Sequence, residues 1–182
     1  MDTKTSKPRR QFLKALSGVA LLGLAGTSSL PGRLWAAEQG AGAGSGKSPD
    51  EVDWKSLTEE QWRQRLTEEE FEILREEGTE PAFSSPLNAE TRKGTYICAG
   101  CALPLFSSET KFESGTGWPS FYEPLPDAVD TKTDYKLLFP RTEYHCRRCG
   151  GHQGHVFDDG PEPTGKRWCN NGRALDFRPA EG

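Results

Sequence analysis

The chain has 182 residues, and its 27 Asp and Glu outnumber its 23 Lys and Arg, which gives a formal charge of −4 at pH 7. Beyond residue 36 the acidic excess grows to 26 against 17, a formal charge of −9. Proteins that bind nucleic acids hold the phosphate backbone with clustered Lys and Arg. The composition therefore argues against a nucleic-acid-binding protein.

Residues 1–36 have the pattern of an export signal. A basic start with Arg9 and Arg10 precedes an apolar stretch that Gly and Ser interrupt, and small residues follow. The Arg pair with its following Gln-Phe-Leu-Lys resembles the bacterial twin-arginine signal, although Pro8 stands where Ser or Thr is usual. An uncleaved anchor needs about 18 or more apolar residues with few interruptions. We therefore expect cleavage and a periplasmic or otherwise exported protein, with membrane contact only through this signal.

A flexible linker and one domain follow the signal. Residues 37–51 are rich in Gly, Ala and Ser and bury too little apolar surface to order themselves. Residues 52–182 have the length of one ordinary domain. Within it, Thr58 and Thr67 each stand three residues before Gln or Glu, a capping-box pattern. That pattern predicts two short helices within residues 54–78.

The remainder of the domain has the texture of a β protein. Short apolar or β-branched runs alternate with Gly, Pro and Asp, which predicts strands separated by turns. We expect a mainly β (α+β) domain with antiparallel strands and helices at its start. The predicted strands are GTYIC, LPLF, TKFES, YKLLF, TEYHC, HVF and ALDF.

Two Cys-x-x-Cys pairs, each in a strand-to-turn context, predict a metal site. Cys98 with Cys101 and Cys146 with Cys149 supply four thiolates, the full ligand set of a tetrahedral ion. The 44 residues between the pairs indicate that the ion would hold two distant hairpins together. Because four thiolates leave no position for water, we expect one structural ion, zinc by preference, with iron an open alternative.

Disulfides are the alternative for these pairs, since oxidising compartments favour them. A redox-active Cys-x-x-Cys would instead indicate a disulfide oxidoreductase, but no thioredoxin-like βαβ pattern surrounds either pair. The shared hairpin form of the two pairs favours zinc. Export of the folded protein would also allow metal insertion in the reducing cytoplasm.

Cys169 is the fifth cysteine and has no partner. Its neighbours, among them Arg167, Asn170 and Asn171, form a polar and partly cationic setting that favours the thiolate. His152 and His155 lie in the Gly-rich segment GGHQGHVFDDG, and a thiolate with a proton donor is the minimum for nucleophilic catalysis. Each His also has an ordinary hydrogen-bonding interpretation, and a zinc-stapled binding module with an incidental cysteine stays open.

The segments CAGC, SGTGWPSFYEPL and RTEYHCRRCGGHQGHVFDDGPEPTGKRWCNNGRALDF closely resemble the methionine-(R)-sulfoxide reductase family over residues 56–177. The resemblance implies two antiparallel sheets forming a barrel-like core, with a structural zinc ion on the four cysteines. The family motif Arg-aromatic-Cys-hydrophobic-Asn is here Arg167-Trp168-Cys169-Asn170-Asn171. Three positions depart from the family, and they concern the shape of the pocket. Trp168 replaces Tyr or Phe, Asn170 replaces Ile or Val, and Gln153 replaces Leu.

The resemblance also implies an activity, the reduction of the R epimer of methionine sulfoxide in proteins or peptides. Cys169 would attack the sulfoxide sulfur and become a sulfenic acid. An aromatic wall would hold the substrate methyl group. The implied catalytic residues are Cys169, His152, His155, Asn171 and Glu143, and the implied substrate-binding residues are Trp118, Phe157 and Arg167.

Thr116 occupies the position where many family members carry a second, resolving cysteine. With four cysteines on metal, Cys169 would have no internal thiol partner. We therefore expect reduction by an external small thiol or a thioredoxin-like protein, and we expect a monomer.

Overall fold

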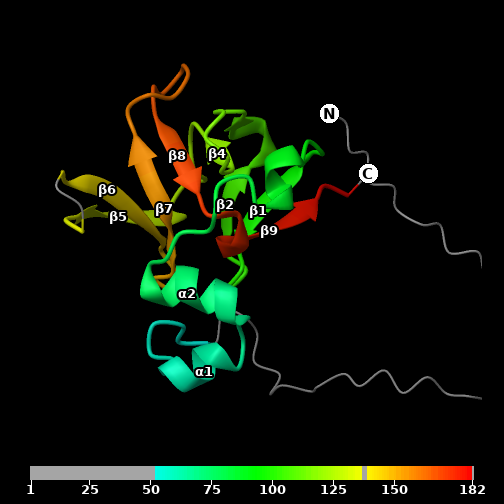
Figure 1. Ribbon diagram of the computed structural model, residues 1–182. Helices are drawn as coiled ribbons and strands as arrows, with labels where there is room; N and C mark the ends of the chain where they lie inside the picture. The colour runs from blue at the N-terminus through cyan, green and yellow to red at the C-terminus, as the bar shows by residue number, and fades with distance from the viewer. Residues whose placement is uncertain (1–51, 137–138, 182) are drawn as a thin grey trace, which may run out of the picture. The chain divides into compact units, whose positions relative to one another are not determined.

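The computed structural model describes residues 52–136 and 139–181 (Figure 1). The expected export signal, residues 1–36, and the expected linker, residues 37–51, lie outside the described residues and stay predictions. Among the helices that are described, none combines the length and the apolar character needed to cross a bilayer.

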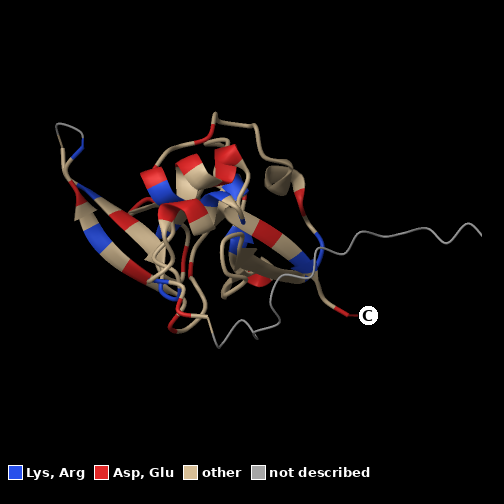
Figure 2. Ribbon diagram, turned by 90° about the horizontal axis from the view of Figure 1, so that it is seen from below, with Lys and Arg blue, Asp and Glu red and all other residues tan. Residues whose placement is uncertain are grey.

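The two helices begin where the sequence predicts. α1 (Glu59–Arg63) and α2 (Glu68–Glu76) follow Thr58 and Thr67, and both caps are complete capping boxes. Each Thr hydroxyl accepts a backbone N–H three residues on, and the side chain there accepts the Thr N–H. Glu77, with φ of 57°, ends α2 in the left-handed conformation. Acidic residues line both helices (Figure 2), and the side chains that α2 buries are Phe71, Ile73 and Leu74.

The strands form two antiparallel sheets, as predicted. The smaller sheet has the order β2-β1-β9 and the larger β3-β4-β8-β7-β6-β5. The strands are β1 (Gly94–Cys98), β2 (Pro104–Ser107), β3 (Lys111–Phe112), β4 (Ser120–Phe121), β5 (Val129–Asp134), β6 (Arg141–Cys146), β7 (His152–Phe157), β8 (Arg167–Asn170) and β9 (Leu175–Pro179). The 3₁₀ turns are η2 (Pro86–Ala89), η3 (Ser108–Thr110) and η4 (Gly172–Ala174).

The expected barrel-like closure is wrong. Each sheet keeps two edges in the described residues, β2 and β9 in one and β3 and β5 in the other. β3 is only two residues long, and β5 exposes four consecutive residues. A two-residue strand and an exposed polar strand offer little that another strand could pair with, so the sheets stay open.

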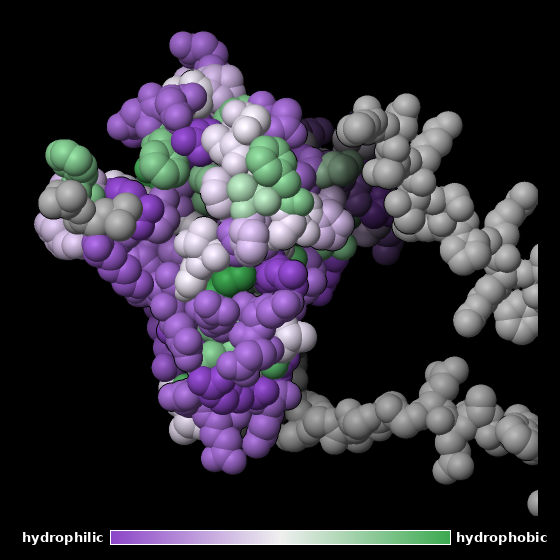
Figure 3. Space-filling model, viewed as in Figure 1, coloured by the Kyte–Doolittle hydropathy of each residue, from purple (hydrophilic) through white to green (hydrophobic). Residues whose placement is uncertain are grey.

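The predicted strand YKLLF is also wrong. The strand lies earlier, at β5, whose sequence VDTKTD has no apolar alternation. Tyr135 and Phe139 instead belong to the connection between β5 and β6, with exposed fractions of 77% and 79%. Apolar surface is visible there, beside the grey segment (Figure 3). An edge strand with one half-buried side needs few apolar residues, which is why its pattern was missed.

Aromatic side chains join the two sheets. Tyr96 and Phe106 come from the smaller sheet, Phe121 and Tyr144 from the larger, and all four are fully buried. The rings of Phe106 and Phe121 stack with centroids 4.2 Å apart, and Tyr96 meets Phe121 edge-on at 4.9 Å. Large rings in such contacts bury much apolar area and stabilise the packing beyond that area. The functional strands β6, β7 and β8 are therefore fixed on a rigid core.

Candidate active site and metal centre

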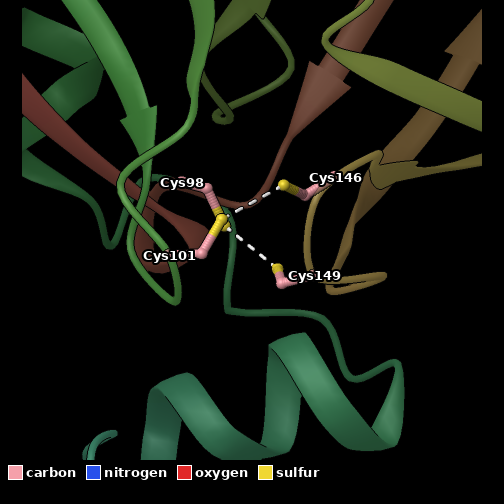
Figure 4. A group of neighbouring side chains, drawn as sticks. All are labelled: Cys98, Cys101, Cys146 and Cys149. Carbon is pink, nitrogen blue, oxygen red and sulfur yellow. Dashed lines mark hydrogen bonds between the residues drawn. The ribbon is translucent and has the colours of Figure 1, made fainter. Parts of the chain in front are cut away.

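Four cysteines from distant parts of the chain meet at one point (Figure 4). Cys98 ends β1 and Cys101 lies in the following turn, while Cys146 ends β6 and Cys149 lies in the turn after it. All four are buried. The Sγ atoms of Cys98 and Cys149 are 3.7 Å apart, and those of Cys101 and Cys146 are 3.5 Å apart.

These distances fit a tetrahedral metal ion. Thiolates about 2.3 Å from zinc lie about 3.8 Å from one another, whereas a disulfide joins sulfurs at about 2.05 Å. The Gly151 N–H donates to Cys149 Sγ at 3.4 Å, the type of outer contact that orients a metal ligand. The cysteines are therefore arranged to bind one ion, as the sequence predicts.

Cys169 lies at a separate pocket. Strand pairing places it between Ser120 of β4 and His155 of β7, so a His 14 positions earlier in the chain becomes its direct neighbour. Gly154 makes this approach possible, because a Cβ there would stand 1.9 Å from the Cys169 carbonyl oxygen. The pocket is lined by Thr79, Trp118, Arg141, Gly154, His155, Phe157, Cys169, Asn170 and Asn171.

The cationic sequence neighbours of Cys169 do not make its thiol more acidic overall. Burial raises the pKa of the Cys169 thiol, and the guanidinium of Arg167 and the hydroxyl of Thr116 only partly oppose that rise. The resting protein therefore holds mostly the thiol at neutral pH, not the thiolate that the sequence analysis favours.

His155 reaches the pocket, as predicted, and its partner is a residue that the sequence analysis missed. His155 Nε2 lies 2.9 Å from Asp134 Oδ2. The same carboxylate accepts hydrogen bonds from Arg141 Nη2 at 2.7 Å and from the Lys136 N–H at 2.8 Å. These bonds hold the pKa of Asp134 well below its usual range. Asp134 is thus a fixed anion that orients the imidazole.

His152 and Glu143 lie close together but are not among the pocket-lining residues. His152 Nδ1 is 2.5 Å from Glu143 Oε1, and both side chains are almost fully buried. Burial lowers the pKa of His152 to about 4, so the imidazole is neutral at pH 7. Its Nε2 is buried with no hydrogen-bond partner, and because the ring proton points from Nδ1 to the Glu143 carboxylate, this nitrogen can accept a hydrogen bond, for example from a water molecule.

Asn171 is held by Glu80, a second residue that the sequence analysis missed. Asn171 Oδ1 accepts the Glu80 N–H at 3.1 Å, and the Glu80 carbonyl accepts Trp118 Nε1 at 3.1 Å. The buried Glu80 carboxylate accepts the N–H groups of Gly172 at 2.6 Å and Arg173 at 3.0 Å. Glu80 therefore fixes the pocket's indole and its amide together.

Two of the family departures contact each other. Asn170 Nδ2 lies 3.5 Å from Gln153 Oε1, and Asn170 Oδ1 accepts the Tyr144 hydroxyl at 2.7 Å. Gln153 is the extra residue of a register shift on β7, and its Nε2 donates to Cys98 Sγ at 3.5 Å. Asn170 Nδ2 also donates to the Asn171 carbonyl at 2.7 Å. The two amides thus belong to one buried hydrogen-bond network that connects the metal centre to the strand of Cys169.

Phe157 and Arg167 lie opposite each other on β7 and β8. The Arg167 guanidinium stands 4.4 Å from the Phe157 ring centroid and forms two 2.9 Å hydrogen bonds with Asp159. Phe157 lines the pocket, while Arg167 supports it from the side.

Several known proteins are similar to this chain in sequence. The SelR domain family matches residues 66–179. The peptide methionine sulfoxide reductase MsrB of Leptospira interrogans is 52% identical over 122 residues, covering 66% of this chain and 93% of that protein. MsrB of Methanosarcina barkeri is 52% identical over 125 residues, 68% of this chain and 88% of that one. The chloroplastic peptide methionine sulfoxide reductase B1 of Arabidopsis thaliana is 42% identical over 177 residues, which cover 97% of this chain and 80% of that protein.

A half-buried thiol beside a His and an indole, on a scaffold with a four-cysteine centre, fits an oxidoreductase. The chain belongs to the MsrB family of peptide methionine sulfoxide reductases.

Proposed function

We propose that the chain reduces the R epimer of methionine sulfoxide, mainly in oxidised proteins, with Cys169 as the nucleophile. Family membership supports the reaction, that of a peptide-methionine (R)-S-oxide reductase. The observation that carries the mechanism is the pocket in which Cys169, His155 and Trp118 face one space. A pocket of aromatic walls with few polar groups suits a methyl sulfoxide.

The raised pKa of Cys169 fits this chemistry. A sulfoxide sulfur is attacked only when its oxygen is protonated or strongly hydrogen-bonded, and the resting thiol still carries a proton for that oxygen. In the net step the sulfur–oxygen bond of the substrate breaks, and the oxygen and the proton end on Cys169 as a sulfenic acid. The methionine sulfur gains the electron pair that the Cys169 sulfur loses.

Several polar residues would each contribute to hydrogen bonding of the sulfoxide oxygen. The second Nδ2 hydrogen of Asn171 would donate to it from the pocket wall. His155 gives its Nε2–H to Asp134, so it would donate through Nδ1 in the doubly protonated form of the ring. His152, whose ring proton points to Glu143, would accept a hydrogen bond from a bridging water at its unpartnered Nε2, and that water would donate to the oxygen. Fixed donors aimed at developing charge are a main source of rate enhancement.

The apolar residues would select the substrate. Trp118 would pack against the methyl group, since the Glu80 carbonyl already takes its indole N–H and fixes the ring. Phe157 would cover the substrate side chain, and Arg167 would hold Phe157 in place.

Resetting the enzyme would require an external reductant. Thr116, at the position of a resolving cysteine, bonds Ser114 at 2.8 Å and offers no thiol, and the other four cysteines form the metal centre. Two external thiols would convert the sulfenic acid to the Cys169 thiol and water while they form a disulfide. A small thiol or a thioredoxin-like protein would serve.

The metal would be one zinc ion with a structural role, held by Cys98, Cys101, Cys146 and Cys149. Zinc supplies the bond energy that joins the turn after β1 to the turn after β6. The twin-arginine-like residues 1–36 support repair outside the cytoplasm.

The test is a thiol-driven turnover assay on separated R and S epimers of a methionine sulfoxide peptide, with Cys169→Ser measured beside it. We expect turnover of the R epimer alone and its loss in the variant. The S epimer is the internal control for background reduction. Turnover by Cys169→Ser would exclude the nucleophile, and no turnover of either epimer by the metal-loaded protein would favour a binding module.

A further inference from the structure

A second group of metal-ligand atoms lies on β6 and β7. Glu143 and His145 are two residues apart on β6, and His145 pairs across to His152 on β7. Their ligand atoms all lie within 4.8 Å of one another. Two imidazoles and a carboxylate are a ligand set that suits Zn²⁺ and related ions.

One oxygen of the Glu143 carboxylate lies within hydrogen-bonding distance of both imidazoles. Glu143 Oε1 lies 2.5 Å from His152 Nδ1 and 2.8 Å from His145 Nε2. Ligands about 2.0–2.1 Å from a tetrahedral ion lie about 3.4 Å apart, so an ion needs only small side-chain movements.

The group is open to solvent on one side. A hollow lined by Glu77, Lys132, His145 and His152 among others leads to it. Glu77 Oε1 stands 3.9 Å from His145 Nε2 and is within reach as a fourth ligand.

A cationic side chain already lies between the two carboxylates. Lys132 Nζ is 2.5 Å from Glu77 Oε1 and 3.5 Å from Glu143 Oε2. Lys132 projects from an edge strand and is half exposed, so it is free to swing into solvent. An incoming divalent ion would take over the charge compensation that its ammonium provides.

We propose that Glu143, His145 and His152, with Glu77, form a second site for a divalent transition ion such as Zn²⁺, which binds in competition with Lys132. The site differs from the four-cysteine centre in its ligands and in its access to solvent. Occupancy would fix His152 on the metal, so, if the proposed reductase activity holds, the bound ion would slow turnover.

The binding test uses cobalt(II) as the probe. The full chain with zinc in the four-cysteine centre is titrated with cobalt(II) and followed by calorimetry and by absorption. We expect one further equivalent with weak visible bands, and without the intense sulfur-to-cobalt absorption of a thiolate site. No saturable binding, or binding that gives only thiolate absorption, would overturn the proposal.

Two variants should move the affinity in opposite directions. His145→Gln removes a ligand and should weaken cobalt binding by about tenfold or more. Lys132→Met removes one competing charge, while Lys136 stays 2.6 Å from Glu77 Oε2, and should tighten cobalt binding by about tenfold. Glu123→Gln, an exposed carboxylate outside the hollow, is the matched control and should leave it unchanged. If all three variants bound cobalt with the affinity of the wild type, the proposed second metal site would be excluded.

Inhibition is measured separately, so a failure of the reductase assay leaves the binding result intact. Each protein's turnover with added zinc is compared with its own rate without added zinc. Inhibition of the wild type that His145→Gln weakens supports the regulatory consequence. Binding without inhibition would refute that consequence.

Discussion

The four-cysteine centre and the Cys169 pocket use the same functional group for opposite purposes. In the centre, four buried sulfurs lie about van der Waals distance apart and supply all four ligands that a tetrahedral ion needs. In the pocket, one sulfur stands alone, partly accessible, with imidazole, indole and amide around it. The comparison teaches that reactivity follows from access and neighbours, since cysteine chemistry is set by environment.

The strongest test of the difference is the loss of one metal ligand. Cys146→Ser should cost more than about 5 kcal/mol of unfolding free energy, because structural zinc sites contribute about 10 kcal/mol or more to folding. Urea denaturation and elemental analysis would measure stability and metal content together. Cys169→Ser is the control and should unfold like the wild type. If both variants lost similar unfolding free energy, Cys146 and Cys169 would not differ in their structural role.

The second test concerns the support of the pocket. Glu80→Gln leaves only one acceptor oxygen for the N–H groups of Gly172 and Arg173. An unsatisfied buried donor costs about 1–3 kcal/mol, and Asn171 and Trp118 would shift with the segment.

We expect Glu80→Gln to lower kcat by about tenfold or more, with metal content unchanged. Steady-state kinetics would separate kcat from KM, and Glu123→Gln on the surface would serve as the control. A loss of stability with wild-type kcat would show that Glu80 only supports the fold.

The contrast between these residues explains what the sequence could predict. Helix starts at Thr58 and Thr67 and the Cys-x-x-Cys turns are local patterns, since the interacting groups lie within a few residues. Glu80 contacts Asn171 across 91 positions and Asp134 contacts His155 across 21, and no periodicity reports such pairs. The one sign of Glu80 is an acidic residue standing alone in an otherwise uncharged segment, TEPAFSSPLN.

The sheet shows the same limit. The strand at residues 135–139 was predicted from apolar composition, but pairing with β6 selects the polar residues before it. The barrel-like closure came from the resemblance alone, and closure depends on edge strands whose lengths composition does not set. The four clustered cysteines and the separate Cys169 could be singled out because cysteines are few and their spacing is specific.

The third test concerns Gln153 and Asn170, which lie between the four-cysteine centre and the Cys169 pocket. Gln153→Leu removes the acceptor 3.5 Å from Asn170 Nδ2, which keeps its 2.7 Å bond to the Asn171 carbonyl, and Asn170→Val leaves Gln153 Oε1 without this donor. Each loss should cost about 1–3 kcal/mol. The double variant should recover about 1–2 kcal/mol of the summed loss, since residues in contact are coupled. Denaturant unfolding of the four proteins measures this coupling energy. Strict additivity would show that the 3.5 Å contact between the amides has no energetic role.

The smallest expected effect is on the protonation of Cys169. Arg167→Met removes the positive charge that stabilises the thiolate, so the pKa of Cys169, already raised by burial, should rise further. Below the pKa the reactive fraction falls as the pKa rises, so alkylation by iodoacetamide at pH 7 should slow about threefold. Arg173→Met is the control, because it removes a positive charge from a residue that does not line the pocket. A faster reaction in Arg167→Met would contradict the charge assignment.

Gln153 joins the two environments physically. Its side chain donates to a metal-ligand sulfur, while its carbonyl accepts both the backbone and the side-chain N–H of Asn171. Oxidation of a cysteine ligand would release this contact and move a wall of the substrate pocket in the same event. Oxidative damage at the metal centre would therefore lower turnover as well as stability.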